Sequence, residues 1–372
     1  MQHLYNGMIL NKGLKFMTYH THYHKLLRTI DLDMKSVNKI YHPSHFWEHG
    51  SQKITADLAI HGIDSFRRFK SSLSYFVPTY KFNGTATDIK KYTVMRDELC
   101  NVLGHDTKAI LALDEMLTGY SQALADYRVY LASERSEYPY TDCFSESKIG
   151  NPIEQFKFFG RQFSRSALNY LLGLNFLKSC IHELNIKTVI EIGGGFGSLG
   201  EILLSDARND IFYTNIDIPP TIIFSTYYLD AILGRENVAN YLTFQDLKSH
   251  NLEILRRSFK AAVIAPWQIE QLDGEVDLFV NFISFQEMEP DIVTNYLSQI
   301  DRLKTKYILL RNLREGKQIA KNKKSIGVKK PILADDYDEF LFNYKLVSNV
   351  VFPYGYKTVD GFNSELRLYQ RK

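Results

Sequence analysis

Cysteine is scarce in this sequence, and long apolar runs are missing. Its 372 residues include only Cys100, Cys143 and Cys180, an odd number placed far apart. This spacing excludes a disulfide framework and gives no sign of a zinc cluster, so we expect no metal and a reducing compartment. The N-terminal stretch lacks the apolar core of a signal peptide, and no run approaches 18 uncharged apolar residues. We therefore expect a cytoplasmic protein, free or peripherally attached, with no integral membrane segment.

A large charge of one sign is also missing. The formal net charge is +3, with no strong bias in either half, so composition gives no electrostatic case for a nucleic-acid partner. Hydrophobic residues make up 45% and charged residues 23%, which is ordinary for a folded globular chain. At 372 residues, ordinary domain sizes predict two domains.

The sequence pattern changes near residue 186. Before this point apolar residues recur at three- and four-residue spacing, which predicts packed helices. After it, short apolar runs alternate with amphipathic segments. We therefore predict a mainly helical N-terminal domain (1–150) that serves as an acceptor or lid domain, a linker with a bridging helix (151–185), and a ligand-binding domain (186–372).

Five short apolar runs in the C-terminal half predict buried parallel strands. They are "KTVIEI" (187–192), "IFYTNI" (211–216), "AAVIA" (261–265), "DLFVNF" (277–282) and "KYILLR" (306–311). Helical segments separate most of them, so the fold class is α/β with a doubly wound, Rossmann-like parallel sheet. Two later runs, "YKLVSNVVF" and "SELRLYQ", predict an antiparallel pair that completes the sheet.

A glycine-rich loop follows the first predicted strand, in "TVIEIGGGFGSLGEILL" (188–204). Open parallel sheets bind ligands at this position, and glycines allow the backbone to approach the ligand closely. The spacing of Gly195, Gly197 and Gly200 also fits the weak G-x-G-x-x-G pattern of dinucleotide sites. A third interpretation is that Gly193, Gly194 and the others only permit close packing of the strand against the following helix.

Glu191 and Asp217 distinguish between these interpretations. A buried carboxylate such as Glu191 needs a cation or several donors, and a pyrophosphate would supply neither. S-adenosylmethionine carries an ammonium and a sulfonium, so Glu191 favours this cofactor. Asp217 ends the second strand, followed by Ile218, where an acidic side chain accepts hydrogen bonds from ribose hydroxyls. The alternative for Asp217 is that it only begins the turn "DIPP".

These motifs resemble those of a known family. "EIGGGFG" followed by "NIDIPP" is similar to the first two motifs of class I S-adenosylmethionine-dependent methyltransferases. Five further segments resemble the sugar O-methyltransferases of bacterial surface-polysaccharide synthesis, namely "FWEHGSQ", "SKIGNP", "APWQIEQL", "DLFVNFISFQEME" and "PYGYKTVDGF". The resemblance covers most of the chain from about residue 40 onward. It implies methyl transfer to a hydroxyl of a sugar, nucleotide-sugar or glycan acceptor, without identifying that acceptor.

Further cofactor contacts are expected at the ends of the third and fourth strands. Trp267 is positioned to stack on the adenine and Gln268 to bond its edge, although a tryptophan at a strand end is core packing about as often. Asn281 is expected beside the methionine portion, bonding either the cofactor or the loop backbone. Arg161 is a candidate partner for the cofactor carboxylate, with a surface helix arginine as the alternative.

Methyl transfer requires an aligned acceptor and one base. "SFQEME" presents Gln286 and Glu287 near the expected methyl position, and Glu287 is the first candidate base. Glu289 precedes a proline and is expected to cap the next helix. His49 in "FWEHG" is the second candidate, because imidazole titrates near neutral pH. A solvated or structural role is the alternative for each candidate.

Two further patterns leave alternatives open. "HTHYH" alternates His20, His22 and His24 as on one face of a strand, but it lies near the terminus without a carboxylate partner. The segment 311–330 has eight basic residues against Glu315 alone, which predicts either a solvated loop or a lid that attracts an acidic acceptor.

Two competing functions remain for the chain as a whole. They are an NAD(P)-dependent oxidoreductase and a noncatalytic module on the same fold. A homo-oligomer also remains open.

Overall fold

The computed structural model describes residues 21–81, 88–104, 106–322 and 327–372. Residues 21–34 are helical. The helices that follow are α2 (His45–His61), α3 (Lys70–Tyr75), α4 (Ile89–Val102), α5 (Thr107–Thr118), α6 (Tyr120–Ser133), α7 (Arg165–Cys180), α8 (Ser198–Leu204), α9 (Thr221–Leu233), α10 (Tyr241–Asp246), α11 (Leu252–Ser258), α12 (Pro290–Arg302) and α13 (Asp336–Phe340). None of the described helices is both long and apolar enough to span a bilayer.

The strands form one large sheet and one small hairpin. They are β1 (Phe156–Phe158), β2 (Arg161–Phe163), β3 (Thr188–Ile192), β4 (Phe212–Ile216), β5 (Val238–Ala239), β6 (Ala261–Ile264), β7 (Leu278–Phe282), β8 (Tyr307–Leu313), β9 (Tyr344–Val350), β10 (Tyr356–Lys357) and β11 (Asn363–Arg371). The large sheet has the order β10-β11-β8-β7-β3-β4-β6-β5, and β9 also pairs with β11. The strands β3, β4, β5, β6, β7 and β8 run parallel, while β9, β10 and β11 pair antiparallel.

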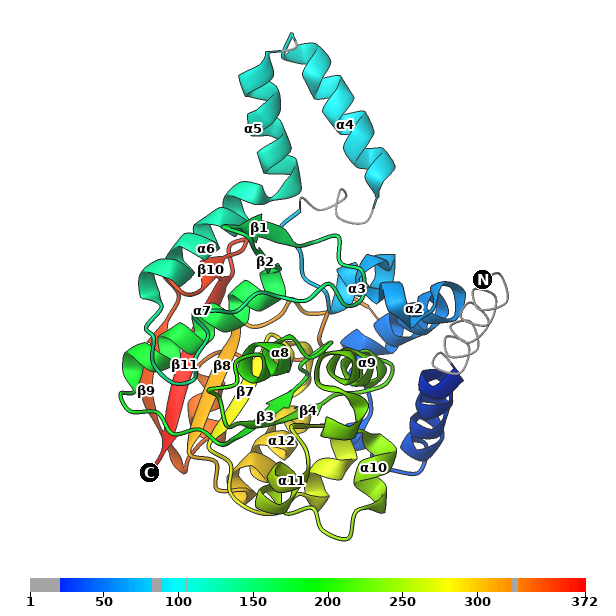
Figure 1. The fold of residues 1–372 in the computed structure, drawn as a ribbon, viewed down its shortest axis with the longest axis vertical. Helices are drawn as coiled ribbons and strands as arrows, with labels where there is room; N and C mark the ends of the chain where they lie inside the picture. Colours follow the sequence, from blue (N-terminus) through cyan, green and yellow to red (C-terminus); the bar gives the residue numbers. More distant parts are fainter. Residues whose placement is uncertain (1–20, 82–87, 105, 323–326) are drawn as a thin grey trace, which may run out of the picture.

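The predicted α/β fold class is therefore confirmed, including all five parallel strands and the late antiparallel pair. The apolar runs become central strands because both of their faces are buried. One face packs in a core cluster with α7, α8 and α9, and the other packs with α11 and α12 (Figure 1). Tyr337 of α13 also belongs to the second cluster. The carboxyl ends of the parallel strands consequently open at one edge, and this edge positions the site.

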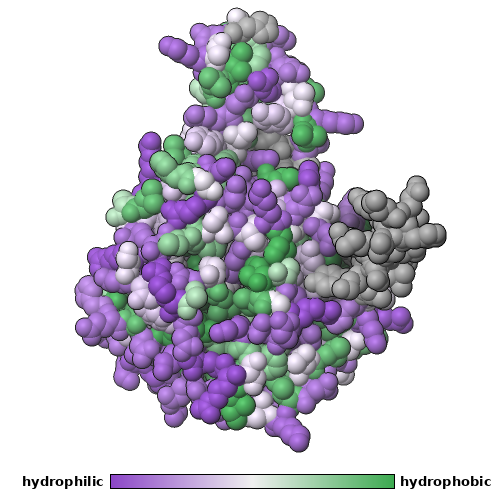
Figure 2. Space-filling model, in the orientation of Figure 1, coloured by the Kyte–Doolittle hydropathy of each residue, from purple (hydrophilic) through white to green (hydrophobic). Residues whose placement is uncertain are grey.

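The N-terminal region is mainly helical, as expected, and shares a core with the sheet region. Buried residues of α2, such as Trp47 and Ile54, belong to the same cluster as α7 and α9. The hairpin of α4 and α5 projects from this body (Figure 1) and has a small core of its own around Leu117. Exposed apolar side chains such as Ile89 and Val102 lie among polar ones on that projection (Figure 2). The predicted division into 1–150, 151–185 and 186–372 stays a prediction.

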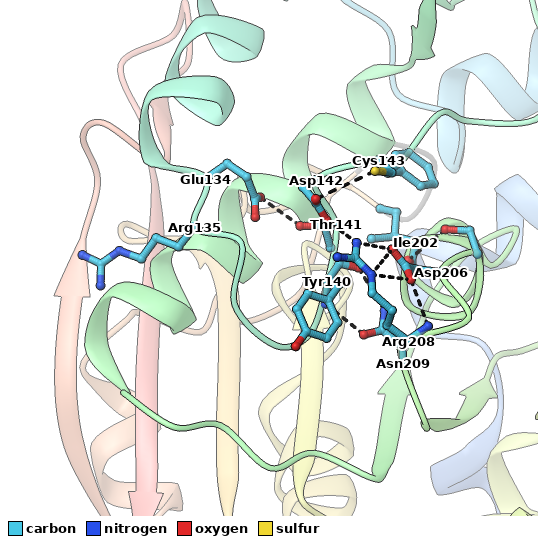
Figure 3. Close-up of polar contacts among 12 residues, drawn as sticks. Glu134, Arg135, Tyr140, Thr141, Asp142, Cys143, Ile202, Asp206, Arg208 and Asn209 are labelled. Atoms are coloured by element: carbon cyan, nitrogen blue, oxygen red, sulfur yellow. Dashed lines mark hydrogen bonds and ion pairs between the residues drawn. The ribbon is translucent and has the colours of Figure 1, made fainter.

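The turn-rich segment between α6 and β1 is fastened to the sheet region (Figure 3). The Asn209 side chain accepts a hydrogen bond from the Tyr140 N–H and donates one to the Tyr140 carbonyl, at 2.8 and 2.9 Å. Arg208 pairs with Asp142 at 2.6 Å, and the buried Lys178 of α7 pairs with Glu134 at 2.9 Å. The first two contacts join this segment to the loop between α8 and β4, and the third joins the end of α6 to α7.

Candidate functional site

A cavity of about 1040 Å³, open solvent at its mouth included, lies at the carboxyl edge of the parallel strands. The strand ends contribute one part of its lining, namely Ile192, Gly193, Gly194, Gly195, Phe196, Ile216, Asp217, Ile218, Pro266, Phe282, Ile283, Ser284, Glu287 and Met288. Helices α7, α9 and α12 contribute Ser166, Asn169, Tyr170, Thr221, Ile292 and Tyr296. The N-terminal region contributes His42, Ser44, Trp47, Tyr75, Phe76 and Pro78. The cavity is therefore enclosed between the sheet edge and the N-terminal region.

The glycine loop forms one wall of this cavity. The Gly193 N–H donates to the Ile216 carbonyl at 2.8 Å, which anchors the loop on β4. Gly193 has φ +70°, and a Cβ atom there would lie 2.2 Å from the Ser284 Oγ atom. Gly193 is thus required by the close approach of the loops after β3 and β7. Gly197 is outside the lining, and a Cβ there would contact Leu229 of α9 at 3.3 Å, so its position serves packing.

Asp217 lies at the end of β4 and reaches the glycine loop. Its two carboxylate oxygens accept hydrogen bonds from the Gly195 N–H at 2.9 Å and the Ile218 N–H at 2.8 Å. Burial raises the pKa of Asp217 to about 8, although these backbone donors favour the charged form. The side chain lines the cavity with 7% of the residue exposed. A ligand that donates hydrogen bonds or carries positive charge would stabilise the ionised carboxylate.

Glu191 lies beneath the glycine loop and is not part of the cavity lining. It is fully buried, and the Tyr213 hydroxyl donates to its carboxyl group. Burial raises its pKa to about 7, with Tyr170 and Tyr213 opposing that shift through hydrogen bonds. A Cβ atom on Gly194 would lie 2.5 Å from the Glu191 Oε2 atom. Glu191 therefore contacts the loop rather than the open cavity, and its pairing with a cofactor stays a prediction.

The loop after β7 forms the opposite wall. Asn281 is fully buried and donates to the Ile192 carbonyl at 2.9 Å and to the Ser284 Oγ atom at 2.6 Å, while its own oxygen accepts from the Phe285 N–H. Of the two alternatives left open for Asn281, the structure shows the bond to the loop backbone. Ile283 has φ +74°, which is strained for a β-branched residue. This strain occurs beside the glycine loop, where ligand-binding sites commonly store it.

Glu287 lines the cavity and pairs with a lysine. Its carboxylate lies 2.8 Å from the Lys317 Nζ atom, with 8% of its side chain exposed. The Ser44 hydroxyl donates to the Glu287 carbonyl at 2.7 Å, joining the N-terminal region to this loop. Lys317 also lies 4.6 Å from the centre of the Phe46 ring. The Lys317 ammonium thus gives this carboxylate a direct partner that positions it at the cavity wall.

Three predicted cofactor contacts lie outside the cavity lining. Gln268 is fully buried, and its amide bonds the Ala265 N–H and the Tyr241 carbonyl. Trp267 packs edge-on against Tyr241 at 5.9 Å. Only Pro266 of "PWQ" reaches the cavity, because the chain turns into a short 3-10 helix at that residue. Arg161 lies in β2, where its guanidinium donates to the Phe144 carbonyl at 3.4 Å.

Two predicted catalytic residues also lie outside the lining. Gln286 is buried, and its side-chain oxygen accepts from the Leu313 N–H at 2.7 Å, which fixes the loop to β8. His49 is exposed on α2, with its ring 6.0 Å from that of His45. Helix phase explains its position, because the same helix directs Trp47 to the cavity. Glu289 is the N-cap residue of α12, as expected, but its side chain accepts from the Lys329 N–H instead of the helix.

Sequence reasoning missed the contribution of α7. Ser166, Asn169 and Tyr170 stand at i, i+3 and i+4 of this helix and line the cavity. Polar residues at that spacing within the apolar "SRSALNYLLGLN" were the available signal. It also missed Thr221 at the start of α9, whose buried hydroxyl has no hydrogen-bond partner among the described residues.

The basic segment and the histidines divide between described and undescribed residues. Arg311 is a buried strand residue and Lys317 pairs with Glu287, whereas Lys323 and Lys324 lie outside the described residues. His20 also lies outside them. Within the described ranges, no group of three His, Cys, Asp or Glu side chains is arranged to hold a metal ion.

Comparisons with known proteins give structural likenesses only. No protein-family model matches the chain, and no curated protein matches it. Similar solved structures include the small RNA methyltransferase HEN1, at 17% identity over 60% of this chain and 27% of that one, with a TM-score of 0.38. The mitomycin 7-O-methyltransferase MmcR matches at 12% identity over 87% and 73% of the two chains, with a TM-score of 0.34. The magnesium protoporphyrin IX methyltransferase ChlM from Synechocystis PCC 6803, with bound SAH, matches at 13% identity over 56% and 85%, with a TM-score of 0.35. This chain spans about a quarter of the length of the first of these proteins.

Proposed function

We propose that this protein is an S-adenosylmethionine-dependent O-methyltransferase that acts on a hydroxyl of a sugar or glycan in surface-polysaccharide synthesis. The position of Asp217 is the main observation that supports the cofactor assignment. Its carboxylate lies at the cavity wall, 2.9 Å from the Gly195 N–H of the glycine loop. A ligand bound against the glycine loop would therefore contact the Asp217 carboxylate.

This arrangement disfavours a dinucleotide. A pyrophosphate on a glycine loop needs free backbone N–H groups, yet Asp217 already occupies that of Gly195. Among the described residues, the cavity lining contains the acids Asp217 and Glu287 but no lysine or arginine. A diphosphate on the glycine loop would lie against Asp217 with no lining cation to pair with it, whereas a ligand with a sulfonium and an ammonium would be attracted to this acidic wall.

The residues present fit S-adenosylmethionine, which supplies a methyl group activated by its sulfonium. Gly193, Gly194 and Gly195 give it backbone access, and Asp217 accepts hydrogen bonds from ribose hydroxyls. The Thr221 hydroxyl, which has no hydrogen-bond partner among the described residues, provides a further polar contact at the cavity wall. Glu191 lies beneath the loop, where its carboxyl group contacts Gly194 and adds to the local negative potential when it is ionised.

The remaining cavity fits an acceptor that must lose a proton. Glu287, which pairs with Lys317 at the cavity wall, is the proposed base for the acceptor hydroxyl. His42, Trp47, Tyr75 and Phe76 cover the cavity from the N-terminal region, which excludes water and offers aromatic faces to a sugar ring. The sugar class itself rests on the sequence resemblance, and these aromatic residues are compatible with it.

Equilibrium binding tests the cofactor assignment. Isothermal titration should show binding of S-adenosylmethionine and S-adenosylhomocysteine without binding of NAD, and Asp217→Ala should weaken both by about 2 to 5 kcal/mol. Binding of NAD alone would instead establish the oxidoreductase.

Turnover tests the acceptor assignment. Release of S-adenosylhomocysteine with a panel of nucleotide sugars and glycans should identify an acceptor. Cofactor binding without turnover on any hydroxyl compound would favour the noncatalytic module.

A further inference from the structure

The wall that α7 contributes to the cavity differs chemically from the glycine-loop wall. Its polar members are Ser166 and Asn169, and the two residues together are here called the α7 wall. Helix α7 approaches the sheet unusually closely because a Cβ atom at Gly173 would lie 2.3 Å from the Phe282 ring. This approach lets Asn169 reach a side chain of β8.

Arg311 of β8 fixes the orientation of the Asn169 amide. Its guanidinium donates to the Asn169 Oδ1 atom at 2.7 Å. Because arginine only donates hydrogen bonds, Asn169 must turn its oxygen to Arg311 and its NH₂ group away from it. That NH₂ group has no hydrogen-bond partner among the described residues, and Asn169 lines the cavity. The α7 wall therefore presents donors to a ligand.

Two guanidinium groups behind this wall have no carboxylate partner in the part of the chain that the structure describes. Arg311 is fully buried, and within the described ranges neither it nor Arg165 lies within ion-pair distance of an acid. Arg165 donates to the Thr79 carbonyl at 3.1 Å and faces the Tyr80 and Tyr356 rings.

The groups around Arg311 leave this region positive. Burial lowers the pKa of Arg311, and Arg165 lowers it further, while Asp126, Tyr80 and Tyr356 act in the opposite sense. Asp126 accepts a hydrogen bond from the Tyr80 hydroxyl. Arginine remains charged in proteins at neutral pH. The guanidinium groups of Arg165 and Arg311 are therefore two cations that act with one carboxylate, that of Asp126, among the described groups around Arg311.

We propose that the α7 wall binds an anionic group, a carboxylate or a phosphate, of the methyl acceptor. This proposal rests on the proposed function and specifies its substrate class. The strand order assigns the wall to the acceptor: Asp217 follows β4, whereas Arg311 lies three strands away on β8, beyond β3 and β7. That separation is about 14 Å at the usual strand spacing, so a cofactor whose ribose lies at Asp217 leaves this end for the second substrate.

Asn169→Asp is the selective test. Aspartate keeps an oxygen for Arg311, so the fold should be retained, but it replaces the donor with a negative charge. The probes are glucose 1-phosphate, glucuronate and the neutral methyl α-glucoside, titrated calorimetrically with and without S-adenosylhomocysteine. Asn101→Asp adds the same charge at an exposed position on α4 and serves as the matched control.

The native protein should bind glucose 1-phosphate or glucuronate at least about 10-fold more tightly than methyl α-glucoside, and Asn169→Asp should remove that preference. The stronger anionic probe identifies the phosphate or carboxylate. Arg165→Met provides a second variant with the same expected loss, should Asn169→Asp lower the melting temperature.

Equal binding of charged and neutral probes by the native protein would overturn the proposal. Unchanged anion affinity in both variants would also overturn it. A loss of affinity confined to S-adenosylhomocysteine would overturn it as well, because that result would assign the wall to the cofactor. If S-adenosylhomocysteine fails to bind while the anion preference persists, the proposed function is wrong and the anion site stands separately.

Discussion

The affinity for S-adenosylmethionine should increase with pH up to about pH 8 and then level off. Burial raises the pKa of Asp217 to about 8, so the ligand-free protein holds this carboxyl protonated at lower pH. A ligand that donates ribose hydroxyls and carries positive charge prefers the carboxylate, so its binding must release a proton below that pKa. The dissociation constant can therefore change by at most tenfold per pH unit, or about 100-fold between pH 8 and pH 6, equivalent to about 2.7 kcal/mol.

Asp217→Asn isolates this effect. The variant cannot ionise, so its affinity should be weak and should lose this pH dependence. Asparagine must also place its NH₂ group against the N–H of either Gly195 or Ile218, which now donate to the carboxylate. That conflict should cost about 1 to 3 kcal/mol of folding free energy, so thermal melting is measured alongside binding. Asp291→Asn, at an exposed position on α12, is the matched control.

Calorimetric titration at pH 6, 7, 8 and 9 is the appropriate assay, in buffers of different ionisation enthalpy so that proton release is counted directly. A dissociation constant that does not vary with pH in the native protein would refute the role of Asp217. The same slope in Asp217→Asn would assign the proton to another group.

Four further changes test the catalytic and structural arguments. Glu287→Gln should lower kcat by about 10²- to 10⁴-fold with cofactor affinity little changed, and near-native turnover would exclude it as the base. Lys317→Met removes the partner 2.8 Å from that carboxylate and so the contact that positions it, so kcat should fall, and an unchanged kcat would contradict the pairing argument. Gly193→Ala places a Cβ 2.2 Å from the Ser284 Oγ atom at φ +70°, so unfolding should become easier by about 2 to 5 kcal/mol in denaturant titrations. Burial raises the pKa of Glu191 from 4.5 to about 7, so as regards this group the ligand-free fold is most stable below pH 4.5. The free energy of unfolding should fall by about 3 kcal/mol as the pH rises from there to 7, and Glu191→Gln should flatten that part of the melting profile.

The strands were predictable because their signal is local. A central parallel strand is buried on both faces, so it must be a continuous apolar run, and β3, β4, β6, β7 and β8 all meet this condition. The two-residue β5 and the short β1–β2 hairpin were missed, because two or three residues cannot establish a periodicity.

Side-chain direction at the strand ends was less predictable. Trp267 and Gln268 follow β6 as expected, but the 3-10 helix that starts at Pro266 turns both away from the cavity. Asn281 is buried between two loops, where its amide bonds backbone rather than an open site. In each case the sequence indicated proximity to the strand end, while the local turn determined which way the side chain points.

The sequence by itself determined the sheet, the glycine loop and the placement of Asp217 at the end of the next strand. These features depend on burial, backbone freedom and chain order, which are properties of short segments. Only the tertiary structure decided that Glu191 lies beneath the loop, that Lys317 pairs with Glu287, and that Arg311 turns the Asn169 amide toward the cavity. The last of these contacts joins residues separated by 142 positions, and the packing of α7 against the sheet produces it. No local pattern encodes such a pairing, because its geometry exists only when both elements have been packed together.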